Sequence, residues 1–298
     1  MPGDTLSGFA VIEPAPAKIN LALHVVGERG DGYHLLDSLV TFTAFGDRIA
    51  LSPAGEDRFT LSGRFSATLA AENDNLVTRA RDRLRAALEA TGQSAPPVHI
   101  HLEKNLPIAS GIGGGSADAA ATLRGLLGLW RADLPGDRLD AIAIGLGADV
   151  PMCLAGRPLL ARGIGEDITP LALPALSMVL ANPLVGVSTP AVFRALASKR
   201  NAPLVLRDAA VDWLDAIAGL RNDLEPPARR LCPQIGELAD DLAATDARVV
   251  RMSGSGASCF ALYDSDATAE AAAARLRQQH PDWFITATRT LEGHDGTP

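Results

Sequence analysis

The chain has 298 residues, of which 47% are hydrophobic and 21% are charged, so it is long enough for two domains with ample cores. Its formal net charge of −8 at pH 7 argues against nucleic acid or an anionic membrane as a partner. Three widely spaced cysteines favour reduced thiols, and the first residues lack the basic and apolar runs of a signal peptide. We therefore expect a cytoplasmic protein.

Apolar patterning in the first third of the chain predicts three strands followed by a helix and a fourth strand: 14–26, 36–51, 57–62, 75–90 and 98–103. In the fourth strand, alternate residues are Val, Ile and Leu, and the residues between them include His99 and His101. This pair could be half of a metal site or the polar face of a half-buried strand. Because no Cys or third His lies nearby, we favour the polar face.

The most informative segment is a glycine-rich loop between this strand and a predicted helix over 117–130. Gly111, Gly113, Gly114 and Gly115 stand directly before Ser116. Glycine lets a ligand approach the backbone closely, and a helix start offers free N–H groups and a positive dipole end. The loop is therefore predicted to hold a polyphosphate. The alternative is a glycine-rich turn that leads into a buried helix.

Other details of this region restrict the kind of phosphate site. The chain has no Gly-Lys pair, which excludes a Walker A loop, and a whole region precedes the glycines, unlike a dinucleotide fingerprint. We expect Ser116 or Asp118 to cap the helix. Lys18 lies in an apolar strand and Lys104 just ahead of the loop, and both suit a phosphate or a hydroxyl that loses its proton. Lys18 could instead be a strand-edge residue whose ammonium reaches solvent.

The rest of the chain alternates predicted helices and strands. A helix over 137–146 ends at the turn Gly147-Ala-Asp149-Val-Pro151, where the aspartate is either functional or a cap. The elements expected beyond Pro174 are strands at 176–181, 248–252, 259–263 and 283–290 and helices from 188, at 208–219, 223–231, 233–244 and 267–279. The small residues of 253–258 can form an anion nest or a simple hairpin turn.

Three segments then combine into a family resemblance: Pro16-Ala-Lys-Ile-Asn-Leu, the glycine-serine loop and Ser253-Gly-Ser-Gly. In this order they resemble the GHMP kinases, which phosphorylate small molecules. Together with Asp31-Gly-Tyr-His and Gly147-Ala-Asp-Val-Pro, they are most similar to the branch that acts on the C2 hydroxyl of a methylerythritol carrying a cytidine diphosphate, in the non-mevalonate isoprenoid pathway. One departure is Ile108-Ala109-Ser110, where the resemblance implies more glycine.

The resemblance implies a two-lobed α/β (α+β) fold with domains over 10–172 and 173–292. The first lobe would resemble the second domain of ribosomal protein S5, and the second would be ferredoxin-like. Asp149 would act as the base on the acceptor hydroxyl, and Lys18 would keep Asp149 ionised and stabilise the transferring phosphoryl group. ATP would be the co-substrate, with Mg²⁺ held mainly by phosphates and water and Ser116 as one contact. No protein metal ligand set is expected, and the chain would be a monomer or weak homodimer.

The resemblance also assigns two groups of binding residues. The residues expected to bind ATP are Lys104, Pro107, Ile108, Ala109, Ser110, Gly111, Ile112, Gly113, Gly114, Gly115, Ser116 and Ala117. The residues expected to bind the acceptor are Asn20, Tyr33, His34, Thr189, Phe193, Gly254, Ser255 and Gly256. In this assignment, Tyr33 and Phe193 sandwich the cytosine and His34 hydrogen-bonds its edge.

Two other functions remain open from the residues alone. The chain could be another GHMP kinase, of the homoserine or mevalonate type, or a catalytically silent nucleotide sensor with the same fold. Tyr33 and His34 favour a substrate that carries a pyrimidine. The presence of both Lys18 and Asp149 argues against a sensor, which has no need of a base.

Overall fold

The computed structural model describes residues 6–70, 75–206 and 212–293. The chain forms two compact units, and two long paired strands, β1 (Val11–Glu28) and β2 (His34–Pro53), contribute residues to both. The first unit comprises 1–17, 46–108 and 113–155, and the second comprises 18–45, 109–112 and 156–298. The mixed α/β class is thus confirmed, whereas the domain boundary at 172–173 stays a prediction.

The sheet of the first unit is built around β4 (Val98–Glu103). The second half of β2 pairs with it in antiparallel register, with Arg48 opposite Glu103, and β3 (Arg58–Ser62) pairs with it in parallel. The apolar residues of β4 are fully buried, and His99 and His101 hydrogen-bond to Thr60 and Ser62 of β3. The prediction of a polar face on a half-buried strand is therefore confirmed.

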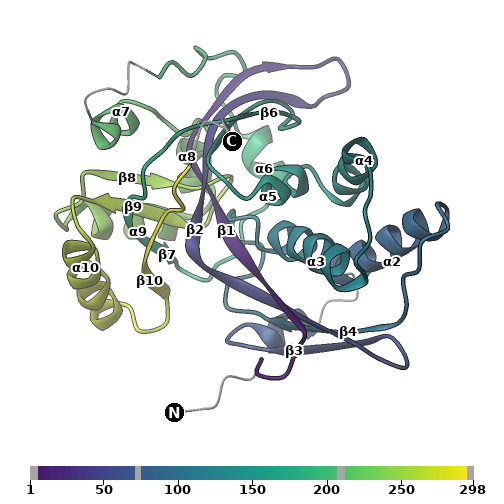
Figure 1. The fold of residues 1–298 in the computed structure, drawn as a ribbon. Coiled ribbons are helices and arrows are strands. Elements are labelled where there is room, and N and C mark those ends of the chain that lie inside the picture. Colours follow the sequence, from purple (N-terminus) through teal and green to yellow (C-terminus); the bar gives the residue numbers. More distant parts are fainter. Residues whose placement is uncertain (1–5, 71–74, 207–211, 294–298) are drawn as a thin grey trace. The chain divides into compact units, whose positions relative to one another are not determined.

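Four helices of the first unit pack together: α2 (Leu76–Glu89), α3 (Gly114–Trp130), α4 (Gly136–Leu146) and α5 (Val150–Ala155) (Figure 1). Asn75 caps α2 by accepting a hydrogen bond from Val77 N–H. The apolar face of this helix is buried. The structure adds α1 (Ser66–Ala70) and α5, which the sequence analysis did not predict. Both are too short to show a helical period.

The second unit contains a four-stranded antiparallel sheet in the order β10-β7-β9-β8. The strands are β7 (Ser177–Asn182), β8 (Val249–Met252), β9 (Cys259–Tyr263) and β10 (Phe284–Arg289). Helices α9 (Pro233–Ala243) and α10 (Asp266–Gln279) pack on this sheet, and their apolar residues share one core with β7 and β9 (Figure 1). The predicted strands and helices of this region are confirmed within a few residues.

Shorter elements complete the second unit. The first half of β2 pairs with β5 (Leu159–Gly163), which pairs with β6 (Asp167–Pro170); neither strand was predicted. The helices are α6 (Thr189–Arg194), α7 (Trp213–Ala218) and α8 (Glu225–Leu231). The helix predicted over 208–219 starts outside the described residues, and its described part is α7. Among the described residues, no helix is both long and apolar enough to span a bilayer.

Candidate active site

In the first unit, the glycine-rich segment becomes the start of α3. Gly113 takes a left-handed conformation with a φ of 65° and precedes the first helical residue, Gly114. The helix therefore begins three residues before the predicted position. No described side chain caps it, so the expectation that Ser116 or Asp118 would do so is wrong. The N–H groups of the first turn are thus left for another acceptor, as an anion site requires.

The turn that carries Asp149 lies close to this helix start. Asp149 is half-buried and directly precedes α5, which packs against α3. A Cβ atom placed on Gly147 would be 4.0 Å from the Ser116 hydroxyl oxygen. The first unit therefore brings Ser116 and the Gly147–Asp149 turn together.

Lys104, expected at the ATP site, is a buried ion-pair residue in the first unit. Its ammonium nitrogen is 2.5 Å from an Asp47 carboxylate oxygen and 2.7 Å from one of Asp118, and its side chain is 3% exposed. Asp118 does not cap α3 because it is the fifth residue of this helix and lies inside it rather than before its start. The ammonium group is thus already bound, and a contact between Lys104 and ATP stays a prediction.

In the second unit, residues 109–112 contact the loop at 253–258. Ser258 N–H donates to the Ser110 carbonyl, and the Ser253 hydroxyl donates to the Gly111 carbonyl. Ala109 has a φ of 50°, the left-handed conformation in which glycine is favoured. The departure from the expected glycine pattern therefore falls on a residue whose backbone would suit glycine better.

The close packing of these two loops explains two of their glycines. Gly111 has a φ of 76°, and a Cβ atom there would lie 2.6 Å from the Gly256 carbonyl oxygen and 2.8 Å from that of Ser253. A Cβ atom on Gly254 would lie 2.7 Å from the Gly111 carbonyl oxygen. Neither position has room for a side chain, so both glycines are required for the packing of one loop on the other.

Lys18 and Asn20 lie on β1 in the second unit, and both are almost fully buried. Lys18 N–H donates to the Ile112 carbonyl, which joins β1 to the glycine loop. The Asn20 amide nitrogen donates to the Ser38 hydroxyl at 2.8 Å, and Asn20 backbone N–H donates to the Ser253 hydroxyl. Among the described residues, Asn20 Oδ1 has no hydrogen-bond partner, so it can accept a hydrogen bond from a ligand.

The three ring-bearing residues assigned to the cytosine also lie in the second unit. Tyr33 ends a tight turn in which Arg29 N–H donates to the Tyr33 carbonyl and Gly32 N–H donates to the Arg29 carbonyl, and 60% of the surface of Tyr33 is exposed. The rings of His34 and Phe193 have centroids 4.7 Å apart. Burial, followed by the charge of Lys199, lowers the pKa of His34. His34 is therefore neutral at pH 7, and its buried Nε2 has no partner among the described residues.

The remaining acceptor residues come together at the loop 253–256. The hydroxyl groups of Thr189 and Ser255 are 2.7 Å apart. The Asn222 side-chain amide donates hydrogen bonds to the carbonyl groups of Met252 and Gly254 and so holds the loop in place. The sequence analysis missed Asn222 because an asparagine about 30 residues from a motif carries no local signal. Ser38, which orients Asn20, was missed for the same reason.

The two predicted catalytic residues belong to different units, with Lys18 in the second and Asp149 in the first. Their pairing stays a prediction. Within the described residues, no group of three His, Cys, Asp or Glu side chains is arranged to hold a metal ion. A magnesium ion bound to ATP needs only one or two protein ligands, because phosphates and water supply the rest.

Comparison with known protein families identifies the class. Residues 75–157 match the model of the GHMP kinases N terminal domain, and residues 201–282 match that of the GHMP kinases C terminal domain. A homoserine kinase from Cytophaga hutchinsonii has the same fold, with a TM-score of 0.68 at 20% identity over 95% of this chain and 94% of its own. At that identity, the likeness concerns the fold alone.

Two further relatives narrow the class. A 4-diphosphocytidyl-2-C-methyl-D-erythritol kinase from Rhizobium meliloti (strain 1021) is 60% identical over 291 residues, which cover 96% of this chain and 97% of the relative. The crystal structure of a 4-(cytidine 5'-diphospho)-2C-methyl-D-erythritol kinase matches with a TM-score of 0.79 at 35% identity, over 94% of this chain and 99% of that one. The chain therefore belongs to the 4-diphosphocytidyl-2-C-methyl-D-erythritol kinase family of GHMP small-molecule kinases.

Proposed function

We propose that this chain transfers the γ-phosphoryl group of ATP to the C2 hydroxyl of 4-diphosphocytidyl-2-C-methyl-D-erythritol, a step of the non-mevalonate isoprenoid pathway. The observation that carries the proposal is the group of ring-bearing and polar residues in the second unit, in a chain 60% identical to a kinase named for this substrate. Pyrimidine recognition needs a stacking surface and a hydrogen-bonding edge, and this group offers both.

In this proposal, the acceptor binds in the second unit. Tyr33 and Phe193 stack on the cytosine, and the neutral His34, with one ring nitrogen free, hydrogen-bonds its edge. Thr189, Ser255 and the adjacent backbone of Gly254 and Gly256 hydrogen-bond the diphosphate. The unpaired Asn20 Oδ1 accepts a hydrogen bond from a hydroxyl group of the methylerythritol.

The transfer itself is assigned to Lys18 and Asp149. Asp149 takes the proton of the C2 hydroxyl, the resulting oxygen bonds to the γ-phosphorus, and the bond to the β-phosphate oxygen breaks to release ADP. Lys18 stabilises the negative charge on the transferring group. The phosphates of ATP rest on backbone N–H groups of 111–116, and the Ser116 hydroxyl would contact the magnesium ion that ATP carries.

We assign this reaction to the cytoplasm. Three cysteines, Cys153, Cys232 and Cys259, are free and buried, as suits a reducing compartment. The chain would act as a monomer or weak homodimer.

The decisive test measures turnover with ATP and three acceptors: the cytidine diphosphate substrate, homoserine and mevalonate. We expect phosphorylation of the first alone. Turnover of homoserine or mevalonate instead would identify a different GHMP kinase, and ATP binding without turnover of any acceptor would identify a sensor.

The same assay tests the base. Asp149→Asn keeps the shape of the side chain and removes its basicity, so the rate should fall by about 10²–10⁴ while ATP affinity measured by calorimetry is retained. Asp140→Asn, at an exposed position on α4, is the matched control and should leave kcat unchanged. An Asp149→Asn rate within a few-fold of the unmodified enzyme would exclude Asp149 as the base.

A further inference from the structure

A buried ionic triad in the first unit, Asp47, Lys104 and Asp118, has no part in the proposed chemistry. The Lys104 ammonium contacts one oxygen of each carboxylate, and all three side chains are between 0% and 3% exposed. Asp47 comes from β2, 57 residues before Lys104, and Asp118 from α3, 14 residues after it. Three buried ionisable groups cost considerable desolvation, so a contribution to stability alone does not account for the triad.

The first role concerns the residues that lead into the glycine loop. The second oxygen of Asp47 accepts hydrogen bonds from the backbone N–H groups of Asn105 and Leu106, at 2.5 and 2.8 Å. Lys104 is itself held by its backbone, because its N–H donates to the Ser62 carbonyl and its carbonyl accepts from Phe65 N–H. The chain that enters the loop is therefore fixed at three consecutive residues.

The second role concerns the residues that leave the loop. Asp118 lies in the second turn of α3, and its contact with Lys104 joins this helix to the same ammonium group. A Cβ atom on Gly114, the first residue of α3, would be 3.2 Å from the Lys104 ammonium nitrogen. The ammonium group therefore lies directly against the helix start, where a side chain at 114 would displace it.

The charges of the triad can balance. Burial first, and then the neighbouring Asp47, raise the pKa of Asp118 well above its ordinary value, although Lys104 opposes this. Burial acts to lower the pKa of Lys104, but the charges of Asp118 and Asp47 outweigh it and raise that pKa. Protonation of Asp118, which its raised pKa favours, would remove one of the two carboxylate charges that face the single ammonium group of Lys104.

We propose that Lys104 and Asp47 are positioning residues for ATP: the single ammonium group holds the two ends of the 107–113 segment in the geometry that the phosphates need, without itself contacting them. The inference rests on the proposed binding of ATP phosphates at the start of α3. It assigns Lys104 an indirect role in place of the direct contact expected for a lysine beside a phosphate loop.

Direct contact with a phosphate and indirect positioning of the loop are two possible roles for Lys104, and they predict opposite changes in ATP affinity for one substitution, Asp47→Asn. Asp47→Asn removes a negative charge near the phosphates and releases Lys104. If Lys104 binds a phosphate directly, ATP should then bind more tightly. If the triad positions the loop, ATP should bind more than tenfold more weakly, because the asparagine must turn an N–H group toward either the ammonium or the two backbone N–H groups.

The experiment measures ATP affinity by calorimetry in the absence of acceptor for Asp47→Asn, Lys104→Met and Glu103→Gln. We expect losses of more than tenfold for the first two. Glu103 pairs with Arg48 at the neighbouring position of the same two strands, so Glu103→Gln is the matched control and should change ATP affinity less than twofold. Because no acceptor is present, the result does not depend on which alcohol the enzyme phosphorylates.

A second readout separates positioning from general damage to the fold. For Lys104→Met, the KM for ATP should rise more than tenfold while the KM for the acceptor changes less than twofold. Unchanged or tighter ATP binding in a folded Asp47→Asn or Lys104→Met variant would overturn the proposal, as would equal losses for both substrates with a lowered melting temperature.

A third measurement uses the unmodified enzyme, in case these variants fail to fold. The amide hydrogens of Asn105 and Leu106 should be protected from exchange without nucleotide, as strongly as those of β4. Exchange at the rate of an exposed loop would show that Asp47 does not hold these residues, and the proposal would fail.

Discussion

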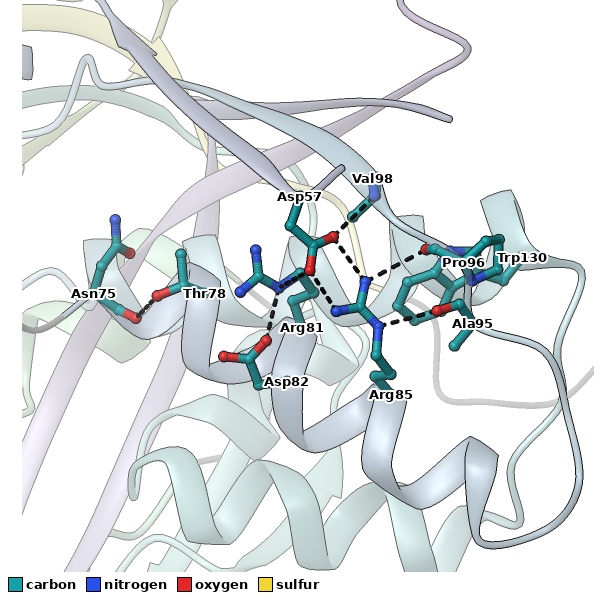
Figure 2. A network of polar contacts seen from close by, with 10 residues as sticks. All are labelled: Asp57, Asn75, Thr78, Arg81, Asp82, Arg85, Ala95, Pro96, Val98 and Trp130. Atoms are coloured by element: carbon teal, nitrogen blue, oxygen red, sulfur yellow. Dashed lines mark hydrogen bonds and ion pairs between the residues drawn. The ribbon is translucent and has the colours of Figure 1, made fainter. Parts of the chain in front are cut away.

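Asp57 is the centre of a second polar network in the first unit, shown in Figure 2. Its carboxylate accepts two hydrogen bonds from the Arg85 guanidinium, at 2.5 and 2.8 Å, and one from Val98 N–H at 3.0 Å. Arg85 also donates to the carbonyl groups of Ala95 and Pro96. Asp57 therefore holds helix α2 against the start of β4, and we predict that Asp57→Asn destabilises the fold.

The expected magnitude follows from the pKa of Asp57. Its hydrogen bonds with Arg85, more than any other interaction, lower this pKa from 3.8 to about 2. A lowering of that size corresponds to about 2.4 kcal/mol at most. The side chains of Asp57 and Arg85 are 27% and 19% exposed, so solvent screening reduces this to about 1–2 kcal/mol. Because the folded-state pKa is the lower one, this stability is present above pH 4 and is lost as the pH falls toward 2.

Urea denaturation of the unmodified protein and of Asp57→Asn, at pH 7 and at steps down to pH 3, checks this prediction. The free energies of unfolding should differ by about 1–2 kcal/mol at pH 7, and the difference should shrink below pH 4. Asp82→Asn is the control, since Asp82 is 59% exposed and contacts only Arg81 in Figure 2; it should cost less than about 0.5 kcal/mol. A difference for Asp57→Asn that stays constant with pH would refute the assigned pKa.

Three other predictions separate folding from binding. Gly111→Ala should destabilise the fold by about 2–4 kcal/mol in denaturation experiments, because its Cβ meets backbone oxygens at a positive φ. Gly115→Ala, in contrast, adds a Cβ at an exposed position and should stabilise α3 by up to about 1 kcal/mol. The same substitution should weaken ATP binding measured by calorimetry. Unchanged ATP affinity would show that the phosphates bind elsewhere. Phe193→Ala should raise the acceptor KM, with a stacking loss of about 0.5–1.5 kcal/mol, and leave the ATP KM unchanged; equal losses for both would make Phe193 structural.

The elements that the sequence predicted well are those with a regular apolar period. β4 alternates buried and half-exposed residues along its whole length, and α2 buries four residues at helical spacing. β5 and β6 were missed because β5 (Leu-Leu-Ala-Arg-Gly) does not alternate apolar and polar residues, and β6 (Asp-Ile-Thr-Pro) has a single large apolar residue and ends in proline. They form because β5 pairs with the first half of β2, and β6 then pairs with β5.

The candidate site shows a different limit of prediction from sequence. The motif residues of the second unit do come together, as the contacts of His34 with Phe193 and of Thr189 with Ser255 show. Residues that support them from a distance carried no local signal. Asp47 is one charge at the middle of a long strand, and its link to Lys104 depends on the antiparallel register of β2 and β4, which periodicity does not specify.

The glycines of the phosphate motif show why a motif match alone does not identify the residues that touch a ligand. Gly111 is glycine because backbone oxygens of the second unit leave no space for a Cβ. A Cβ atom on Gly114 would lie 3.2 Å from the Lys104 ammonium in the first unit, so this group would have to shift by a few tenths of an ångström to admit a side chain. Gly115 has only an ordinary contact with Leu76, at 3.5 Å, so packing leaves its identity unexplained. Of the three, Gly115 is therefore the position at which close approach of a ligand best accounts for glycine.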